Sequence, residues 1–204
     1  MTLVPYRKHH VEKYHQWMCS PELLEATASE PLSLQEEYEM QQTWRDDEAK
    51  CTFIILAGGR GYEGDEIEEE RMVGDVNLFL HDRDDPTNAE IEIMVAEPKW
   101  RRKGLAKEAL HIMMGYALKN LNITRFFAKI GTKNTASLSL FQGLGYTEVN
   151  YVEAFEEHEL ALPCKPGSDD DTRDRVMALV QEALEEVDYY SLKSTQEKWK
   201  NEVD

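Results

Sequence analysis

Two spacings of hydrophobic residues run along the chain, and together they outline a domain of mixed strands and helices. Apolar residues that alternate with polar ones, or gather in short runs, predict strands, because successive side chains of a strand point to opposite faces. Apolar residues three and four apart predict amphipathic helices. The expected strands are residues 3–6, 51–57, 72–80, 90–95, 125–130, 147–152 and 157–162. The expected helices are residues 9–18, a short helix opening at Ser20, and residues 33–44, 104–118, 134–144 and 172–187.

Capping and turn chemistry sets the boundaries of these elements. Ser33 and Glu36 have the spacing of a capping box, which predicts a helix start. Gly145 can adopt the left-handed conformation that ends a helix. Residues 58–71 lack periodicity and are strongly acidic, so they predict a long exposed hairpin loop. A phosphate-binding glycine loop is excluded there, because the run of like charge would repel a phosphate.

Polar side chains are expected on one face of two central strands. In residues 90–95, Glu90 and Glu92 share a face with Met94, while the apolar residues between them point the other way. Asp75 and Asn77 likewise share one face of their strand. Carboxylates placed in this way on a central strand are candidates for proton transfer.

The segment from Val95 to Ala106 connects a strand to a helix through a basic turn. Its spacing Arg101-x-x-Gly104-x-Ala106 puts small residues where a backbone must approach something closely. The free N–H groups and the dipole of a helix start, next to basic side chains, favour an anion. The alternative is an ordinary strand-to-helix connection with solvated basic residues.

A second motif favours the anion site. About thirty residues further on, Asn134-x-x-Ser137-x-x-x-Phe141 is followed by Gly143-Leu144-Gly145-Tyr146. The two motifs, in this order and spacing, resemble those of the GNAT acetyltransferase superfamily over roughly residues 3–162. The resemblance implies an α+β (α/β/α) fold, with a mixed, mostly antiparallel central sheet that is splayed at its fourth strand and flanked by helices.

The resemblance also implies acetyl-CoA as co-substrate and assigns residues to it. The amides near Val95 and Ala96 would bind the acetyl carbonyl. The helix with Asn134, Ser137 and Phe141 would flank the pantetheine arm. The pyrophosphate would lie on the turn formed by Arg101, Arg102, Lys103, Gly104, Leu105 and Ala106.

Within the superfamily, three segments resemble the eukaryotic N-acetyltransferase 9-like family, of the ribosomal-protein N-terminal acetyltransferase type. They are residues 3–6, 27–32 and 73–80. This resemblance implies a protein or peptide amine as acceptor, either an α-amino group or a lysine. The family domain is expected over residues 1–162 with a shortened first strand. The change of composition after Pro163 predicts an acidic linker and helical tail over residues 163–204.

Acetyl transfer to an amine needs a base for the ammonium and benefits from an acid for the departing thiolate. Glu92 or Glu90 is the expected base, directly or through a water, and Asp75 is a weaker candidate; a structural salt bridge is the alternative for each. Many family members have a tyrosine seven residues after the asparagine, where this chain has Phe141. Tyr146 or solvent is therefore the expected acid, unless thiolate release is unassisted.

The net charge of the chain limits the classes of molecule that it is expected to bind. The 204-residue chain carries a formal net charge of −17, which argues against binding to nucleic acid or anionic membranes. Such a surface suits cationic acceptors, although solubility alone would also explain it. The apolar stripe of the expected tail helix needs to be covered, either by the surface of the domain or by a protein partner.

Cysteine and histidine usage points to a reducing compartment and to no metal. Three cysteines without metal-ligand spacing favour the cytoplasm, or also the nucleus. His15 and Cys19 are four apart on a helix, near His9 and His10, but no further ligand completes a set in the sequence.

Three functions remain open at this point. The leading one is an acetyl-CoA-dependent N-acetyltransferase that acts on a protein amine by direct attack in a ternary complex. The second is the same reaction on a small polyamine or amino-sugar. The third is a GNAT-fold scaffold that works through its acidic loop or tail.

Overall fold

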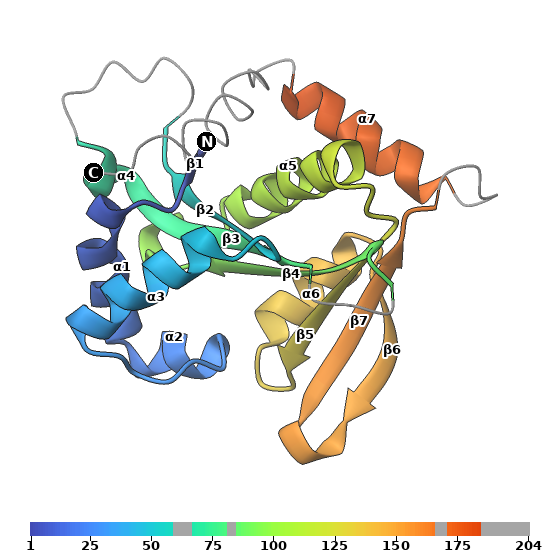
Figure 1. Ribbon diagram of the computed structural model, residues 1–204. Helices are drawn as coiled ribbons and strands as arrows, with labels where there is room; N and C mark the ends of the chain where they lie inside the picture. Colours follow the sequence, from blue (N-terminus) through green and yellow to red (C-terminus); the bar gives the residue numbers. More distant parts are fainter. Residues whose placement is uncertain (59–66, 81–84, 166–170, 185–204) are drawn as a thin grey trace.

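The computed structural model describes residues 1–58, 67–80, 85–165 and 171–184, and it is built around a seven-stranded sheet (Figure 1). The strand order is β1-β2-β3-β4-β5-β7-β6. Neighbours run antiparallel except β4 and β5, which are parallel, so the predicted mixed, mostly antiparallel sheet is confirmed. The strands are β1 (Thr2–Pro5), β2 (Lys50–Leu56), β3 (Met72–Phe79), β4 (Asn88–Val95), β5 (Arg125–Gly131), β6 (Thr147–Val152) and β7 (Glu157–Pro163).

Helices cover both faces of the sheet, which gives the three layers expected of this fold class. Figure 1 shows α1, α2 and α3 on one face, with α5 and α7 on the other. In chain order the helices are η1 (Lys8–His10), α1 (Val11–Met18), α2 (Pro21–Ala26), α3 (Leu34–Asp46), α4 (Glu68–Arg71), η2 (Pro98–Trp100), α5 (Leu105–Asn120), α6 (Thr135–Gly143), η3 (Glu153–Phe155) and α7 (Thr172–Leu184).

The predicted helix ends are confirmed where a local hydrogen bond or a positive φ defines them. The Ser33 hydroxyl accepts from the Glu36 amide at 3.3 Å, and the Glu36 carboxylate accepts from the Ser33 amide at 2.7 Å. A capping box of this kind satisfies two N–H groups that the helix leaves without partners. Gly145, with φ of +95°, lies directly after the end of α6.

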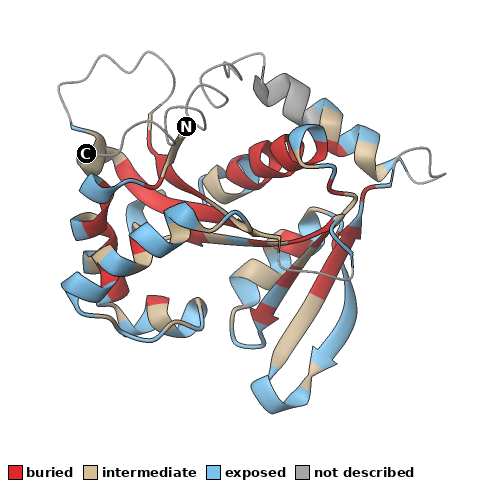
Figure 2. Ribbon diagram, in the orientation of Figure 1, coloured by how far each residue is buried: buried red, intermediate tan, exposed pale blue. Residues whose placement is uncertain are grey.

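Each face of the sheet has its own hydrophobic core (Figure 2). On the α5 face, residues such as Ile91, Leu110 and Phe126 are completely buried and pack together with α6. On the α1–α3 face, Tyr6, Tyr14 and Ile54 belong to a second cluster, next to a row of polar side chains. Residues of β4 alternate between these faces as the sequence pattern predicted.

The sheet opens between β4 and β5. Their pairing covers three residues on each strand, Asn88–Glu90 and Arg125–Phe127, whereas β4 pairs with β3 as far as Val95. Toward the end of β4, after this short pairing, the register with β5 does not continue. This position matches the predicted splay at the fourth strand.

Two predicted segments differ from the structure or extend beyond it. Residues 58–71 were expected to be loop throughout, but residues 68–71 form α4, and Glu68 at its start is hydrogen-bonded to His10. Residues 59–66 lie outside the described part. The predicted tail helix is present as α7, where Val176 is buried in the core cluster that contains α5 residues. Residues 185–204 of the predicted tail are outside the described residues.

Candidate active site

The basic turn after β4 has the geometry of an anion site. Gly104 is the N-cap of α5 with φ of +87°, and Arg102 is also left-handed with φ of +62°. A Cβ added at Gly104 would meet nothing within 4 Å, so the backbone faces open space. The first amides of this 16-residue helix, starting at Leu105 and Ala106, have no partner within the helix and point out of its N-terminus.

Of the basic side chains of the turn, two are exposed to solvent and one is hydrogen-bonded to neighbouring elements. Arg102 and Lys103 are exposed, and the Lys103 ammonium lies 4.8 Å from the centre of the Trp100 ring. The Arg101 guanidinium instead donates to the Val95 carbonyl at 2.9 Å and pairs with Glu22 of α2 at 2.6 Å. The Arg101 side chain therefore ties the turn to the end of β4 and to α2, and the role of the turn in binding a pyrophosphate stays a prediction.

The two backbone amides expected to hold the acetyl carbonyl differ in availability. The Ala96 amide donates to the Val73 carbonyl of β3 at 2.9 Å. N–H directions alternate along a strand, so the amides of Ile93 and Val95 point away from β3, toward the opening beside β5. The prediction that the Ala96 amide binds the acetyl carbonyl is thus wrong. The Val95 amide points toward the opening, as that prediction requires.

A hydrogen-bonded polar row lies on the sheet face under α1 and α3. The Thr52 hydroxyl donates to the Asn77 side-chain oxygen at 2.6 Å, and the Asn77 amide donates to Asp75 at 2.6 Å. The Tyr14 hydroxyl of α1 reaches the same Asp75 oxygen at 3.5 Å. The other carboxylate oxygen of Asp75 is buried without a hydrogen-bond partner among the described residues.

Glu92 continues this polar row in register, since β3–β4 pairing places it beside Asn77. The side chain is open to solvent, yet protein atoms surround it closely enough to raise its pKa to about 7. Burial is the main cause, and the neighbouring Glu90 charge adds to it. Glu90 is engaged, because the Lys129 ammonium pairs with it at 2.8 Å. Glu92 is therefore the better placed of the two predicted bases.

Asp75 is the third carboxylate on this face. It is 2% exposed, and burial raises its pKa to about 6, although the hydrogen bond from Asn77 opposes the shift. Sequence reasoning had ranked it below Glu92 and Glu90 and had not singled out Tyr14, Thr52 or Lys50 at all. For Asp75, Thr52 and Lys50 the sequence signal is the period-two alternation of β2 and β3, which does not reveal which residues of the two strands lie side by side. Tyr14 lies in the apolar stripe of α1, which does not reveal that its hydroxyl reaches Asp75.

Comparisons with known proteins place this geometry in a family. Residues 1–147 match a family described as "Acetyltransferase (GNAT) domain". The chain is also 57% identical over 157 residues to an N-acetyltransferase 9-like protein of Nematostella vectensis, an alignment that covers 77% of this chain and 79% of that protein. The chain belongs to the GNAT acetyltransferase family. It is an acyltransferase.

Further relatives agree with this assignment. The mouse protein named alpha/beta-tubulin-N-acetyltransferase 9 is 50% identical over 163 residues, which are 79% of this chain and 68% of the mouse protein. Among solved structures, spermidine N-acetyltransferase of Vibrio cholerae in complex with CoA and spermine aligns with a TM-score of 0.66 and 18% identity, over 79% of this chain and 94% of that chain. At that identity the structural likeness carries the fold and nothing finer. The predicted resemblance to the N-acetyltransferase 9-like family is confirmed.

The second GNAT motif caps α6. The Asn134 side-chain oxygen accepts from the Ser137 amide at 3.1 Å and so satisfies one free N–H of the helix start. Phe141, 2% exposed, packs edge-on against Tyr146 with ring centres 5.0 Å apart. These contacts explain the spacing of the motif locally, and a contact with a pantetheine arm stays a prediction.

Tyr146 does not fit the role of the acid. Its hydroxyl is buried and donates to the Met114 sulfur of α5 at 3.4 Å, and burial raises its pKa well above the ordinary value. It belongs to the core cluster on the α5 face, whereas Glu92 lies on the opposite face. Local sequence could not reveal this, since the direction of the hydroxyl depends on how α5 packs over residue 146.

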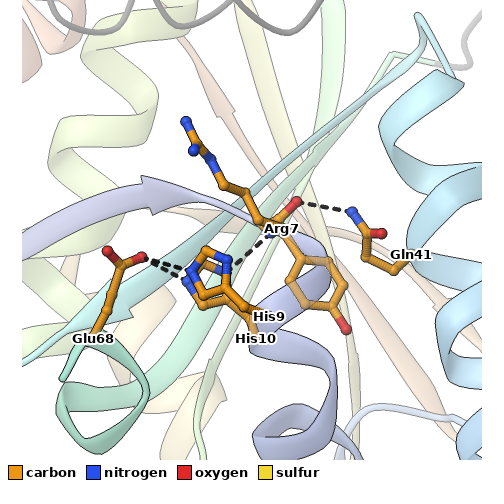
Figure 3. Close-up of polar contacts among 6 residues, drawn as sticks. Arg7, His9, His10, Gln41 and Glu68 are labelled. Carbon is orange, nitrogen blue, oxygen red and sulfur yellow. Dashed lines mark hydrogen bonds and ion pairs between the residues drawn. The ribbon is translucent and has the colours of Figure 1, made fainter. Parts of the chain in front are cut away.

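One side-chain cluster in the GNAT domain has the residue types of a metal site. His9, His10 and Glu68 bring three potential ligand atoms within 4.8 Å of one another (Figure 3). However, the Arg7 amide donates to Nδ1 of His10 at 3.0 Å, so Nε2 carries the proton and donates to Glu68 at 2.6 Å. A metal-bound histidine instead donates from its other nitrogen. The cluster is a hydrogen-bonded tether between η1 and α4.

Proposed function

We propose that this GNAT protein transfers the acetyl group of acetyl-CoA to an amine of a protein or peptide, by direct attack in a ternary complex. The observation that carries the proposal is the position of Glu92. It lies on β4 beside the sheet opening, with a pKa near neutrality and a row of hydrogen-bonded polar groups next to it. The relatives named alpha/beta-tubulin-N-acetyltransferase 9 support a protein acceptor.

The residues present fit acetyl-CoA as donor. The open, left-handed Gly104 and the free amides of α5 suit its pyrophosphate, together with Arg102 and Lys103. The Val95 amide, directed to the opening beside β5, suits the acetyl carbonyl. Asn134, Ser137 and Phe141 would flank the pantetheine through α6. When bound, acetyl-CoA supplies an acetyl group activated as a thioester.

Glu92 would take the proton of the incoming ammonium. Its pKa of about 7 leaves it about half ionised at pH 7, which suits a base that works near neutrality. An α-amino group titrates near ~7.8, within a unit of Glu92, whereas lysine titrates near ~10.4. Deprotonation of a lysine costs about 3.5 kcal/mol more than deprotonation of an α-amine, because their ordinary pKa values differ by about 2.6 units. We therefore favour an α-amino group as the acceptor.

A small polyamine is the second candidate, because Asp75, Glu90 and Glu92 all lie on the acceptor face and attract cations. Nucleic acid and anionic membranes are poor partners for a chain with a net charge of −17. Among the described residues, no helix combines the length and hydropathy needed to cross a bilayer. The free cysteines suit a reducing compartment, and we place the protein in the cytoplasm or nucleus on that ground.

Calorimetric titration with acetyl-CoA tests the donor site. Gly104→Glu should abolish binding, because it puts a negative charge and a strained φ at the pyrophosphate. Gly143→Glu is the matched control, since Gly143 also faces open space but lies in α6 without a positive φ. Equal binding by both variants, or none by the parent protein, would contradict the proposed site.

Turnover assays test the acceptor and the base. Peptides with a free α-amine, N-terminally blocked peptides with one lysine, and spermidine are offered separately. Preference for the α-amine peptide supports the proposal, whereas preference for spermidine supports the small-amine alternative. Glu92→Gln should lower kcat by 10²-fold or more, within the usual range for a general base. Unchanged kcat and pH dependence in this variant would exclude Glu92.

A further inference from the structure

Lys50 is a buried cation on the acceptor face that the mechanism so far does not use. It begins β2 and pairs in register with Phe79 of β3, which in turn pairs with Glu90 of β4. Its ammonium lies 3.6 Å from the ring centre of Trp44 and 3.5 Å from that of Phe79. The nitrogen is buried and has no hydrogen-bond partner among the described residues. Two aromatic faces thus hold the charge in place.

Aromatic faces alone do not balance the loss of hydration of a buried ammonium, so the carboxylates nearby matter. Burial lowers the pKa of Lys50 to about 8, and Glu92 is the first of the carboxylates that oppose this change, followed by Asp75, Asp47 and Glu90. The interaction is mutual. Lys50 is the foremost positive charge that opposes the raised pKa of Glu92, ahead of Lys129.

We propose that Lys50 is a positioning residue for the acetyl transfer: its ammonium, clamped between Trp44 and Phe79, favours the charged form of the Glu92 carboxylate on the same face of the sheet. This inference rests on the proposed function, in which Glu92 is the base. Lys129 is less suited to the task, because its ammonium pairs directly with Glu90 at 2.8 Å and its side chain is exposed. Among the described residues the Lys50 ammonium has no hydrogen-bond partner, and the carboxylates that interact with its charge are led by Glu92 and Asp75.

The Lys50 ammonium and the Glu92 carboxylate are both charged only over a limited pH range. The groups that face Glu92 are Glu90 on its own strand, Asp75 on β3, Lys50 on β2 and Lys129 on β5. Tyr14 of α1 covers Asp75 and stays protonated, since burial raises its pKa well above the ordinary value. Between about pH 7 and pH 8, Glu92 is ionised while Lys50 is still charged.

The test compares Lys50→Met, which keeps an unbranched apolar chain and removes the charge, with Lys50→Arg, which keeps a charge that stacks on aromatic rings. The pH profile of kcat/KM is measured for the full-length protein and both variants with one α-amine peptide. Loss of a neighbouring positive charge should move the acidic limb of Lys50→Met upward by about one pH unit. Activity at pH 7 should then fall about fivefold relative to the parent protein and recover by pH 9. Lys50→Arg should keep the limb within about 0.3 units of the parent.

A second readout does not depend on turnover. Carbon-13 NMR of glutamate-labelled protein follows the Glu92 carboxyl group, assigned by its absence in Glu92→Gln, and should report the same upward shift in Lys50→Met. If the parent protein shows no turnover, but the NMR titration of Glu92 still moves upward in Lys50→Met, the proposed function is contradicted and the Lys50–Glu92 coupling stands. If the parent protein turns over, but neither the acidic limb of the pH profile nor the NMR titration of Glu92 moves in Lys50→Met, the inference is overturned. Thermal melting checks that Lys50→Met is folded, as expected when a methionine replaces a buried charge between aromatic rings.

Discussion

Asp75 offers a direct test of how burial shapes the acceptor face. Its carboxylate is 2% exposed, and burial raises its pKa from the ordinary 3.8 to about 6 in the folded protein. The folded state therefore binds this proton more tightly than the unfolded state. The stability linked to Asp75 is fully present below pH 3.8 and is lost as the pH rises through 6. A difference of about two pKa units corresponds to about 3 kcal/mol.

Asp75→Asn removes the charge and keeps the shape and the acceptor oxygen for Asn77. At pH 7.5 we expect the variant to be more stable than the parent protein by up to about 3 kcal/mol, and near pH 4 by much less. Urea unfolding of both proteins at a series of pH values measures the difference directly. The variant should at the same time bind its amine acceptor more weakly, because one of the three carboxylates on that face is lost.

Asp46→Asn is the matched control with the opposite sign. Asp46 is exposed, and its hydrogen bond to Arg45 lowers its pKa, so removal of its charge should bring no gain as the pH rises. A stability difference between Asp75→Asn and the parent protein that stays constant from pH 4 to pH 7.5 would refute the reasoning. So would a variant less stable than the parent at pH 7.5, where the buried carboxylate of the parent is ionised.

Further substitutions test the strand packing, the tether and the corrected acid. A Cβ at Gly74 would lie 1.9 Å from the Met94 carbonyl oxygen, so Gly74→Ala should destabilise the protein by more than about 3 kcal/mol, measured by urea unfolding. Glu68→Ala leaves the buried His10 N–H without its partner and should cost about 1–3 kcal/mol; a loss below 0.5 kcal/mol would contradict the tether. Tyr146→Phe should leave kcat within about twofold of the parent value, because the hydroxyl only contacts a core sulfur atom; a hundredfold loss would restore Tyr146 as the acid.

Features that depend on a few consecutive residues could be predicted from the sequence. The capping box at Ser33, the left-handed Gly145 and the faces of β4 all follow from local hydrogen bonding, φ preference and a period of two. The two glycine- and asparagine-containing motifs likewise describe helix starts, and their order indicated the GNAT fold. Glu92 could be predicted as a candidate base because the alternation along its own strand places it on a polar face.

Features that depend on contacts between distant residues were decided by the tertiary structure. The sequence separates Lys50 from Phe79 and Glu90, and the register of β2, β3 and β4 brings them into one row under Trp44. Tyr146 was assigned a chemical role that the packing of α5 denies it.

The sequence by itself thus determined the elements, their polar faces and the family, because helix caps and strand alternation are short-range properties. Only the tertiary structure decided which carboxylates have pKa values raised toward neutrality and which amides of β4 point away from β3. Desolvation and Coulomb interactions depend on every atom that packs around a group, and strand register sets which backbone groups meet.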